Sequence, residues 1–288
     1  MRARRVLAVR VVPLLAAVLV VAGATVFADR VVNPALLFLS GTVKIGIHGG
    51  LPGWSYPRDE PEGFDVALAR FLADEYGFTL ELVPLQPEQR ETELRGGRVD
   101  LVIANYSIDG SSWSDPGRSR LDVIDFVGPY FLDKSGVMYS SDKLGDHQAI
   151  PVGNVCVSNG TTAQDYLGGQ GILANQAECF RRFADGTDTQ VVGVVTDLSL
   201  LTTYTREFGA TARPAVWRDD PSNYPVHDER YGIAMADDSP ALCRELTVAV
   251  DEFLTDGEHG WDRAFADHLH GVADRAGHKP ERADTSLC

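Results

Sequence analysis

Basic residues are scarce in this chain outside its first thirty positions. The chain holds 26 Lys and Arg against 41 Asp and Glu. Residues 1–30 contain five of the basic residues and one acidic residue, which leaves 21 basic against 40 acidic in the remainder. A protein that binds a nucleic-acid backbone needs a basic stripe to neutralise phosphates, and none exists beyond the N-terminus. The composition therefore argues against a nucleic-acid partner.

Motifs for catalysis, cofactor binding and metal binding are also missing. No P-loop, no Ser-His-Asp order and no His/Glu metal cluster stands out in the sequence, and it has no Cys-x-x-Cys spacing. Its seven histidines are scattered, and only His268 and His270 lie close together. We therefore expect no metal, no cofactor and no enzymatic activity.

The N-terminus has the pattern of an export signal. Four arginines precede an uncharged, mostly apolar run over residues 11–28, and Asp29 and Arg30 follow it. Such a segment in residues 1–30 is either a cleaved signal peptide, with Val26-Phe27-Ala28 as a passable site, or an uncleaved membrane anchor. We favour the anchor slightly. No cysteine near the end of the run offers a site for a lipid anchor.

Only four cysteines are present, and all lie in the region expected to be exported. An even count in an oxidising compartment favours disulfides, and four cysteines permit three pairings. Proximity in the sequence favours Cys156 with Cys179 and Cys243 with Cys288.

Strand and helix patterns alternate twice along the chain. In the first round, residues 42–47, 79–84 and 99–104 read as strands, and residues 64–76 and 88–95 as helices. A second round runs from about residue 155 to 257. This alternation predicts an α/β protein with mostly parallel sheets. Extended joins at about residues 131–139 and 228–234 predict two lobes connected by two crossings. We assign residues 42–131 and 231–270 to lobe 1, residues 135–228 to lobe 2, and residues 271–288 to a polar, irregular tail.

Five short stretches resemble a known family in order and spacing. They are Gly-Phe-Asp-Val from residue 63, Gly-Arg-Val-Asp-Leu from 97, Ile-Asp-Phe-Val-Gly-Pro-Tyr from 124, Gly-Thr-Thr from 160 and Val-Val-Thr-Asp from 194. Over residues 42–270 the chain resembles the extracytoplasmic solute-binding proteins of polar amino-acid ABC transporters. The resemblance implies the type II periplasmic-binding-protein fold, with two lobes that close on a ligand. The two cysteine pairs look like those of actinobacterial members of glutamate or glutamine type.

Two charged residues are the first candidates for ligand binding. Asp197 ends an apolar strand, where ligands collect in open α/β folds, and its carboxylate could pair with an ammonium group. The alternative is a purely structural role, in which Asp197 caps the following helix. Arg120 lies six residues before Phe126, where the family has the arginine that binds the α-carboxylate. An insertion at residues 109–119 precedes it, so Arg118 is a competing candidate and Arg120 could instead be a solvated loop residue.

Other candidates rest on turns and on the resemblance. Thr161 and Thr162 stand at a helix start beside free backbone N–H groups and hydroxyls, which predicts an anion site, with an ordinary N-cap as the alternative. The resemblance implies that Tyr106 and Ser107 contact the α-carboxylate and that Trp54 or Tyr56 contacts the ligand's side chain.

Together these residues predict a binding protein for a polar amino acid, with glutamate or glutamine favoured. Its partners would be the small ligand, an ABC permease in the membrane and, through the N-terminal segment, the membrane itself. The alternative is a membrane-anchored sensing domain of a signalling system. A third, enzymatic reading, based on relatives of this fold that act as dehydratases, lacks a general base beyond Asp197.

Overall fold

The computed structural model describes residues 38–56, 59–139, 143, 150–185, 187–207, 214–215, 227–236 and 239–288. Within these ranges no helix is both long enough and apolar enough to cross a membrane. The predicted export or anchor segment, residues 1–30, lies outside them.

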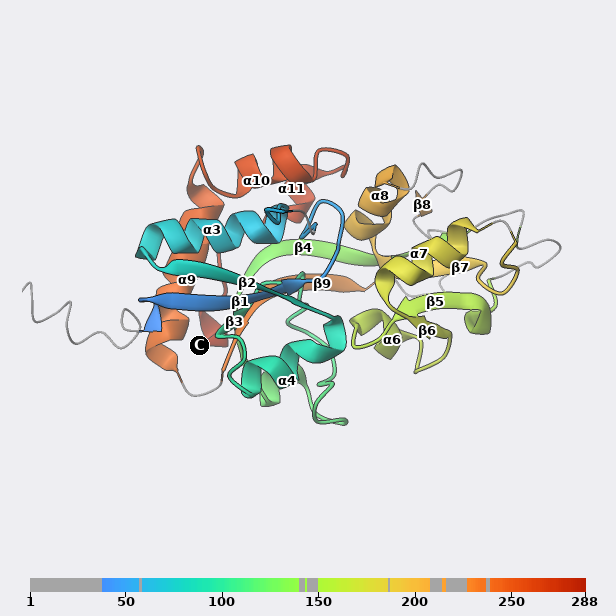
Figure 1. Cartoon of the computed structure of the whole chain (residues 1–288), viewed down its shortest axis with the longest axis horizontal. Helices are drawn as coiled ribbons and strands as arrows, with labels where there is room; N and C mark the ends of the chain where they lie inside the picture. The colour runs from blue at the N-terminus through green and yellow to red at the C-terminus, as the bar shows by residue number, and fades with distance from the viewer. Residues whose placement is uncertain are drawn as a thin grey trace, which may run out of the picture.

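The strands form two groups that share a continuous order, β2-β1-β3-β9-β4-β7-β5-β6, with β8 paired to β4 (Figure 1). Lobe 1 contains β1 (Thr42–His48), β2 (Thr79–Leu85) and β3 (Leu101–Val102). Lobe 2 contains β5 (Val155–Ser158), β6 (Ile172–Ala174), β7 (Gly193–Asp197) and β8 (Pro214–Ala215). Within each lobe β1 pairs in parallel with β2 and β3, and β5 with β6 and β7. The predicted α/β class with two lobes is confirmed.

Two long strands connect the lobes. β4 (Asp125–Tyr139) pairs with β9 (Asp228–Met235) over its first part and with β7 over its last part, and all these pairings are antiparallel. The sequence predicted extended joins here. It missed that the first join is part of a 15-residue strand, because a strand buried on both faces has no polar alternation to mark its ends.

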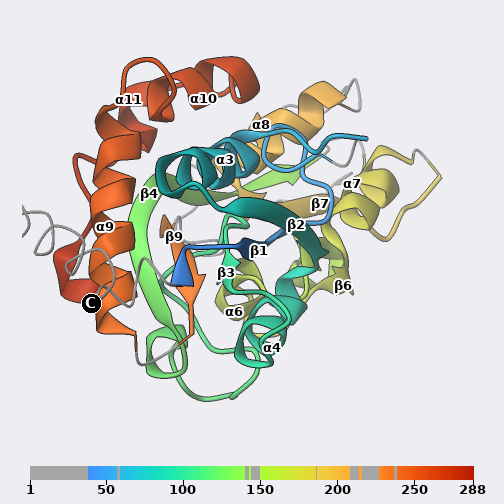
Figure 2. The ribbon, with the colours of Figure 1, turned by 60° about the vertical axis from the view of Figure 1, so that its left-hand side comes forward.

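Helices cover both faces of the lobe 1 sheet (Figure 2). α3 (Phe64–Tyr76), α9 (Pro240–Thr255) and α10 (Trp261–His268) pack around the larger apolar core, and α4 (Arg90–Arg95) lies on the opposite face with a smaller one. α3 buries its apolar positions, as their spacing predicted, and ends at Gly77, whose φ of 71° suits glycine. The short 3-10 helix η1 (Pro87–Gln89) leads into α4.

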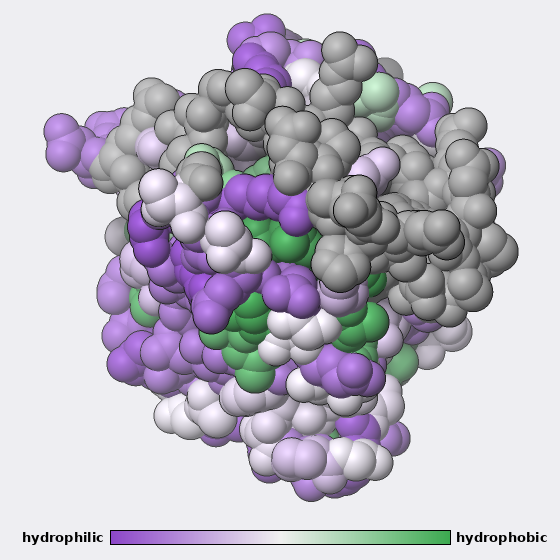
Figure 3. Space-filling model, turned by 90° about the vertical axis from the view of Figure 1, so that its right-hand side faces the viewer, coloured by the Kyte–Doolittle hydropathy of each residue, from purple (hydrophilic) through white to green (hydrophobic). Residues whose placement is uncertain are grey.

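Lobe 2 is flanked by α6 (Thr162–Tyr166), α7 (Gln176–Ala184) and α8 (Leu198–Glu207), with the 3-10 helix η3 (Val152–Asn154) before β5. Figure 3 shows the face of the molecule at the lobe 2 end. On its described part, polar and apolar residues are intermixed. This face thus has no uniform polar or apolar character.

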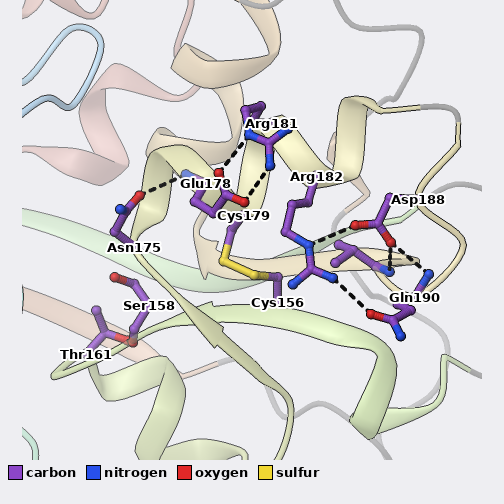
Figure 4. Close-up of a disulfide and its surroundings, with 11 residues drawn as sticks. Cys156, Ser158, Thr161, Asn175, Glu178, Cys179, Arg181, Arg182, Asp188 and Gln190 are labelled. Carbon is purple, nitrogen blue, oxygen red and sulfur yellow. Dashed lines mark hydrogen bonds and ion pairs between the residues drawn. A yellow bond between two sulfur atoms is a disulfide. The ribbon is translucent and has the colours of Figure 1, made fainter.

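Both predicted disulfides are present, Cys156–Cys179 and Cys243–Cys288. The first joins β5 to α7 in lobe 2, beside an ion pair of Glu178 with Arg181 (Figure 4). The second connects α9 to the last residue of the chain. The expectation of an irregular tail was wrong: α11 (Arg275–His278) and η4 (Thr285–Leu287) form there and pack on β4.

Candidate functional site

A cavity of about 390 Å3, including the open space at its mouth, lies between the two lobes. Residues of both lobes line it: His48, Leu51, Pro87, Arg90, Asn105, Ser107 and Arg120 from lobe 1, and Thr161, Thr162, Ala163, Gln176, Thr196, Asp197 and Leu200 from lobe 2. The cavity brings together five predicted ligand contacts: Ser107, Arg120, Thr161, Thr162 and Asp197.

Arg120 reaches the cavity from the short 3-10 helix η2 (Arg120–Asp122), which Ser119 caps. Its side chain is 2% exposed. Nη1 donates to the carbonyl oxygens of Ser107 (2.9 Å) and Asp109 (3.1 Å), and Nη2 donates to the Gly160 carbonyl across the lobes (3.4 Å). Nε has no partner in the part of the chain that the structure describes. A buried guanidinium with a spare donor is suited to bind an anionic group.

The insertion before Arg120 is anchored away from the cavity. Buried Glu91 on α4 accepts hydrogen bonds from Ser112, from Ser114 and from the backbone N–H of Trp113. The competing candidate, Arg118, has a side chain that is 52% exposed, pairs with Asp115 at 3.3 Å, and does not line the cavity. The insertion therefore leaves Arg120, and not Arg118, at the cavity.

Asp197 stands at the carboxyl end of β7, where α8 begins, and is 7% exposed. Its Oδ2 accepts a hydrogen bond from Tyr231. Burial, followed by the negative charges of Glu229 and Asp133, raises the pKa of Asp197 well above its usual value. Burial also raises the pKa of Glu229 and of Asp133. These carboxylates thus form a buried acidic cluster, and a ligand's ammonium group would relieve its mutual repulsion.

The two threonine hydroxyls are engaged within the protein. Thr161 Oγ1 donates to the Ser158 carbonyl (2.7 Å), and Thr162 Oγ1 donates to Glu229 Oε1 (2.9 Å). Glu229 lies on β9, is 1% exposed, and also accepts hydrogen bonds from Tyr166 and from Ser107 of the other lobe. A carboxylate of the protein itself therefore holds two groups that were predicted to hold the ligand's carboxylate.

The aromatic candidates do not line the cavity. Tyr106 supports it instead, since the guanidinium carbons of Arg90 and Arg120 lie 4.9 and 4.8 Å from the centre of its ring. Trp54 is fully buried and packs edge-on against Phe131 and Tyr231, with ring centres 4.7 and 5.4 Å away. It thus contributes to the core of lobe 1 at the crossing.

Glycines at two positions let the lobes approach each other. A Cβ on Gly110 (φ +124°) would lie 2.8 Å from Thr162 Cγ2, and one on Gly160 (φ +70°) would lie 2.7 Å from the backbone N of Glu88. Both contacts are between residues of different lobes, so the two lobes are closed on each other in this structure. Ser111 adds a hydrogen bond from its N–H to Asp165 Oδ2 (3.1 Å).

The sequence reasoning missed Arg90, His48, Gln176 and Glu229. One signal was available for Arg90: it precedes Leu94 by four residues in a predicted helix, so it shares the apolar face of that helix. Neither Gln176 nor Glu229 stands in a pattern that separates it from an ordinary surface residue.

Within the described residues, no group of three His, Cys, Asp or Glu side chains is arranged to hold a metal ion. Arg90, Arg120 and Asp197 give the cavity charges of both signs, with which it could bind a small charged molecule.

Comparison with known proteins identifies the class. The model of the bacterial extracellular solute-binding proteins, family 3, matches residues 43–260, and the chain belongs to this family. The glutamate-binding protein GluB of Corynebacterium glutamicum is 27% identical over 236 residues, which are 76% of each chain. A probable arginine-binding protein, ArtJ of Chlamydia trachomatis, is 26% identical over 226 residues, covering 74% of this chain and 80% of that one.

Solved structures share the fold. The solute receptor for L-cysteine of Neisseria gonorrhoeae superposes with a TM-score of 0.68 at 21% identity, covering 83% of this chain and 96% of that one. An ancestral arginine-binding protein gives a TM-score of 0.61 at 22% identity, covering 80% and 99%. The resemblance expected from the sequence motifs is confirmed at the level of family and fold.

Proposed function

We propose that this protein binds a polar α-amino acid, of glutamate or glutamine type, between its lobes and delivers it to an ABC transporter permease. One observation carries the proposal: Arg120 and Asp197, which have opposite charges and come from different lobes, line the same buried cavity. An α-amino acid offers the complementary pair, a carboxylate for Arg120 and an ammonium group for Asp197.

The relatives support amino-acid transport over the sensing role considered from the sequence. They do not agree on the side chain of the ligand, because one is named for glutamate and another for arginine. Glu229 accepts hydrogen bonds from the hydroxyls of Ser107 and Thr162, so a ligand's α-carboxylate would compete with it for these hydroxyls. Binding and the arrangement of the lobes would then form one linked equilibrium.

A thermal-shift panel with the twenty amino acids, followed by calorimetry on each hit, tests the proposal. A ligand at a hundred times its Kd stabilises the fold by about 2.7 kcal/mol, a shift that is readily measured. We expect Arg120→Ala to abolish the hit and the matched surface variant Arg118→Ala to retain it. If no amino acid shifts the unfolding temperature, or if Arg120→Ala binds as wild type does, the proposal fails.

A further inference from the structure

The cavity holds a second buried guanidinium, that of Arg90, which the α-amino-acid groups leave unused. Arg90 begins α4 and is 4% exposed. Within the described residues, Nη2 donates to Asn105 Oδ1 at 3.4 Å, and Nε has no partner. Among the described residues, no carboxylate lies within ion-pair distance of it; the Asp65 carboxylate attracts it from further away, and the Tyr106 ring centre lies 4.9 Å from its guanidinium carbon.

A buried charge without a counterion is costly to a fold. Burial lowers the pKa of Arg90 to about 10, so the guanidinium is still charged at neutral pH. The side chain of Arg90 is held in place by Asn105, whose backbone N–H in turn donates to Asp65 Oδ2 (2.8 Å). The guanidinium of Arg90 is thus buried and held in place without a directly bound carboxylate of the protein. This arrangement points to an anionic group of the ligand as its partner.

Other polar groups without partners line the same cavity from both lobes. In the part of the chain that the structure describes, Gln176 Nε2 on α7 has no acceptor, and His48 Nδ1 on β1 has no partner. Burial and the nearby Arg90 lower the pKa of His48 to about 3, so the imidazole is neutral and offers one N–H. Guanidinium and amide nitrogens only donate, so the occupant must supply acceptors.

We infer that the ligand is an acidic amino acid, whose side-chain carboxylate binds Arg90 while its α-carboxylate binds Arg120. This inference rests on the proposed function and narrows it. A carboxamide in the same place would turn an NH2 group toward donors and would leave the charge of Arg90 unpaired. The site should therefore discriminate glutamate and aspartate from glutamine and asparagine. The charges of the site and of such a ligand are complementary. Arg90 and Arg120 match its two carboxylates, and Asp197 matches its ammonium group.

Calorimetry with L-glutamate, L-aspartate and L-glutamine on the purified protein tests the inference. We expect at least one acidic amino acid to bind about 100-fold more tightly than glutamine, because truncating or mismatching one member of a buried charge pair has effects of this order. Equal affinities for the acids and glutamine would overturn the inference without any substitution.

Variants of Arg90 then separate the inference from the proposed function. We expect Arg90→Gln to weaken binding of the acidic ligand about 100-fold and to change glutamine binding less than about tenfold. Arg90→Lys, which keeps the charge, should retain more affinity than Arg90→Gln. The matched control is Arg95→Gln, on the same helix, since Arg95 is exposed and bonds Ser114.

The two ideas fail in different ways. If glutamine binds in a manner that depends on Arg120 and Asp197 but not on Arg90, and no acidic amino acid binds more tightly, the inference about the acidic ligand is wrong and the proposed function stands. If none of the twenty amino acids binds, both fall. Should Arg90→Gln not fold, the selectivity of the unmodified protein decides alone.

Discussion

Replacing Asp197 by asparagine should weaken ligand binding and strengthen the ligand-free fold. The carboxylate is 7% exposed, and its pKa is raised by burial and by the charges of Glu229 and Asp133. Ionisation of this group is therefore unfavourable in the folded ligand-free protein, which lowers stability at neutral pH. Asparagine keeps an acceptor for the hydroxyl of Tyr231, which donates to Oδ2. We expect the free energy of unfolding of the ligand-free protein to rise by about 0.5–2 kcal/mol, the usual gain from relieving a strained functional site.

Ligand affinity should move in the opposite direction. Without the carboxylate, the ligand's ammonium group would be buried unpaired, and breaking a buried ion pair in this way costs about 3–5 kcal/mol. This corresponds to an increase in Kd of roughly 100- to 4,000-fold. Urea unfolding without ligand and calorimetry with the ligand from the panel, both at pH 7.5, give the two quantities.

The control is Asp228→Asn on β9. Asp228 has a side chain that is 85% exposed and pairs with Lys134 at 3.5 Å. We expect it to change stability by less than about 0.5 kcal/mol and to leave affinity unchanged. If Asp197→Asn binds ligand within threefold of wild type, or if its ligand-free form is clearly less stable, the assignment of Asp197 as the ammonium partner is refuted.

Three further predictions concern the disulfide, a buried acid and the contact between the lobes. Removing Cys243–Cys288 by a double serine substitution should cost about 4 kcal/mol by the chain-entropy relation, because the bridge closes 45 residues; an unchanged urea midpoint would contradict this. Burial raises the pKa of Asp65 to about 7 from 3.8, so its folded state retains a proton that the unfolded state has released. The stability of the wild type relative to Asp65→Asn should therefore fall by up to about 4 kcal/mol as pH rises from 4 to 7, and a flat difference would show that burial does not hold the proton. Finally, Gly160→Ala should weaken ligand binding at least about tenfold. A Cβ there would lie 2.7 Å from the backbone of the other lobe, and a left-handed backbone conformation is unfavourable for alanine. Equal affinity in calorimetry would mean that the lobes need not approach this closely.

The sequence by itself determined most of the helices and strands and their order. Apolar spacing in α3 and the glycine at position 77 set a helix and its end, and both depend on residues within a few positions of each other. The pairing of Cys243 with Cys288 and the placement of Asp197 at a strand end also followed from neighbourhood in the chain. Such features are local, so a linear pattern contains most of the information.

Only the tertiary structure decided which polar groups face the cavity. Arg90 and Glu229 look like ordinary charged residues in the sequence, and their role depends on burial and on partners far along the chain, such as Thr162, which lies 67 residues from Glu229. The choice between Arg118 and Arg120 likewise depended on how Glu91 anchors the insertion. Trp54 shows the converse, because its position in a loop suggested a ligand contact and long-range packing placed it in the core. The site lies at the interface between the two lobes. That interface depends on packing between residues that are far apart in the sequence, so no local sequence pattern predicts it.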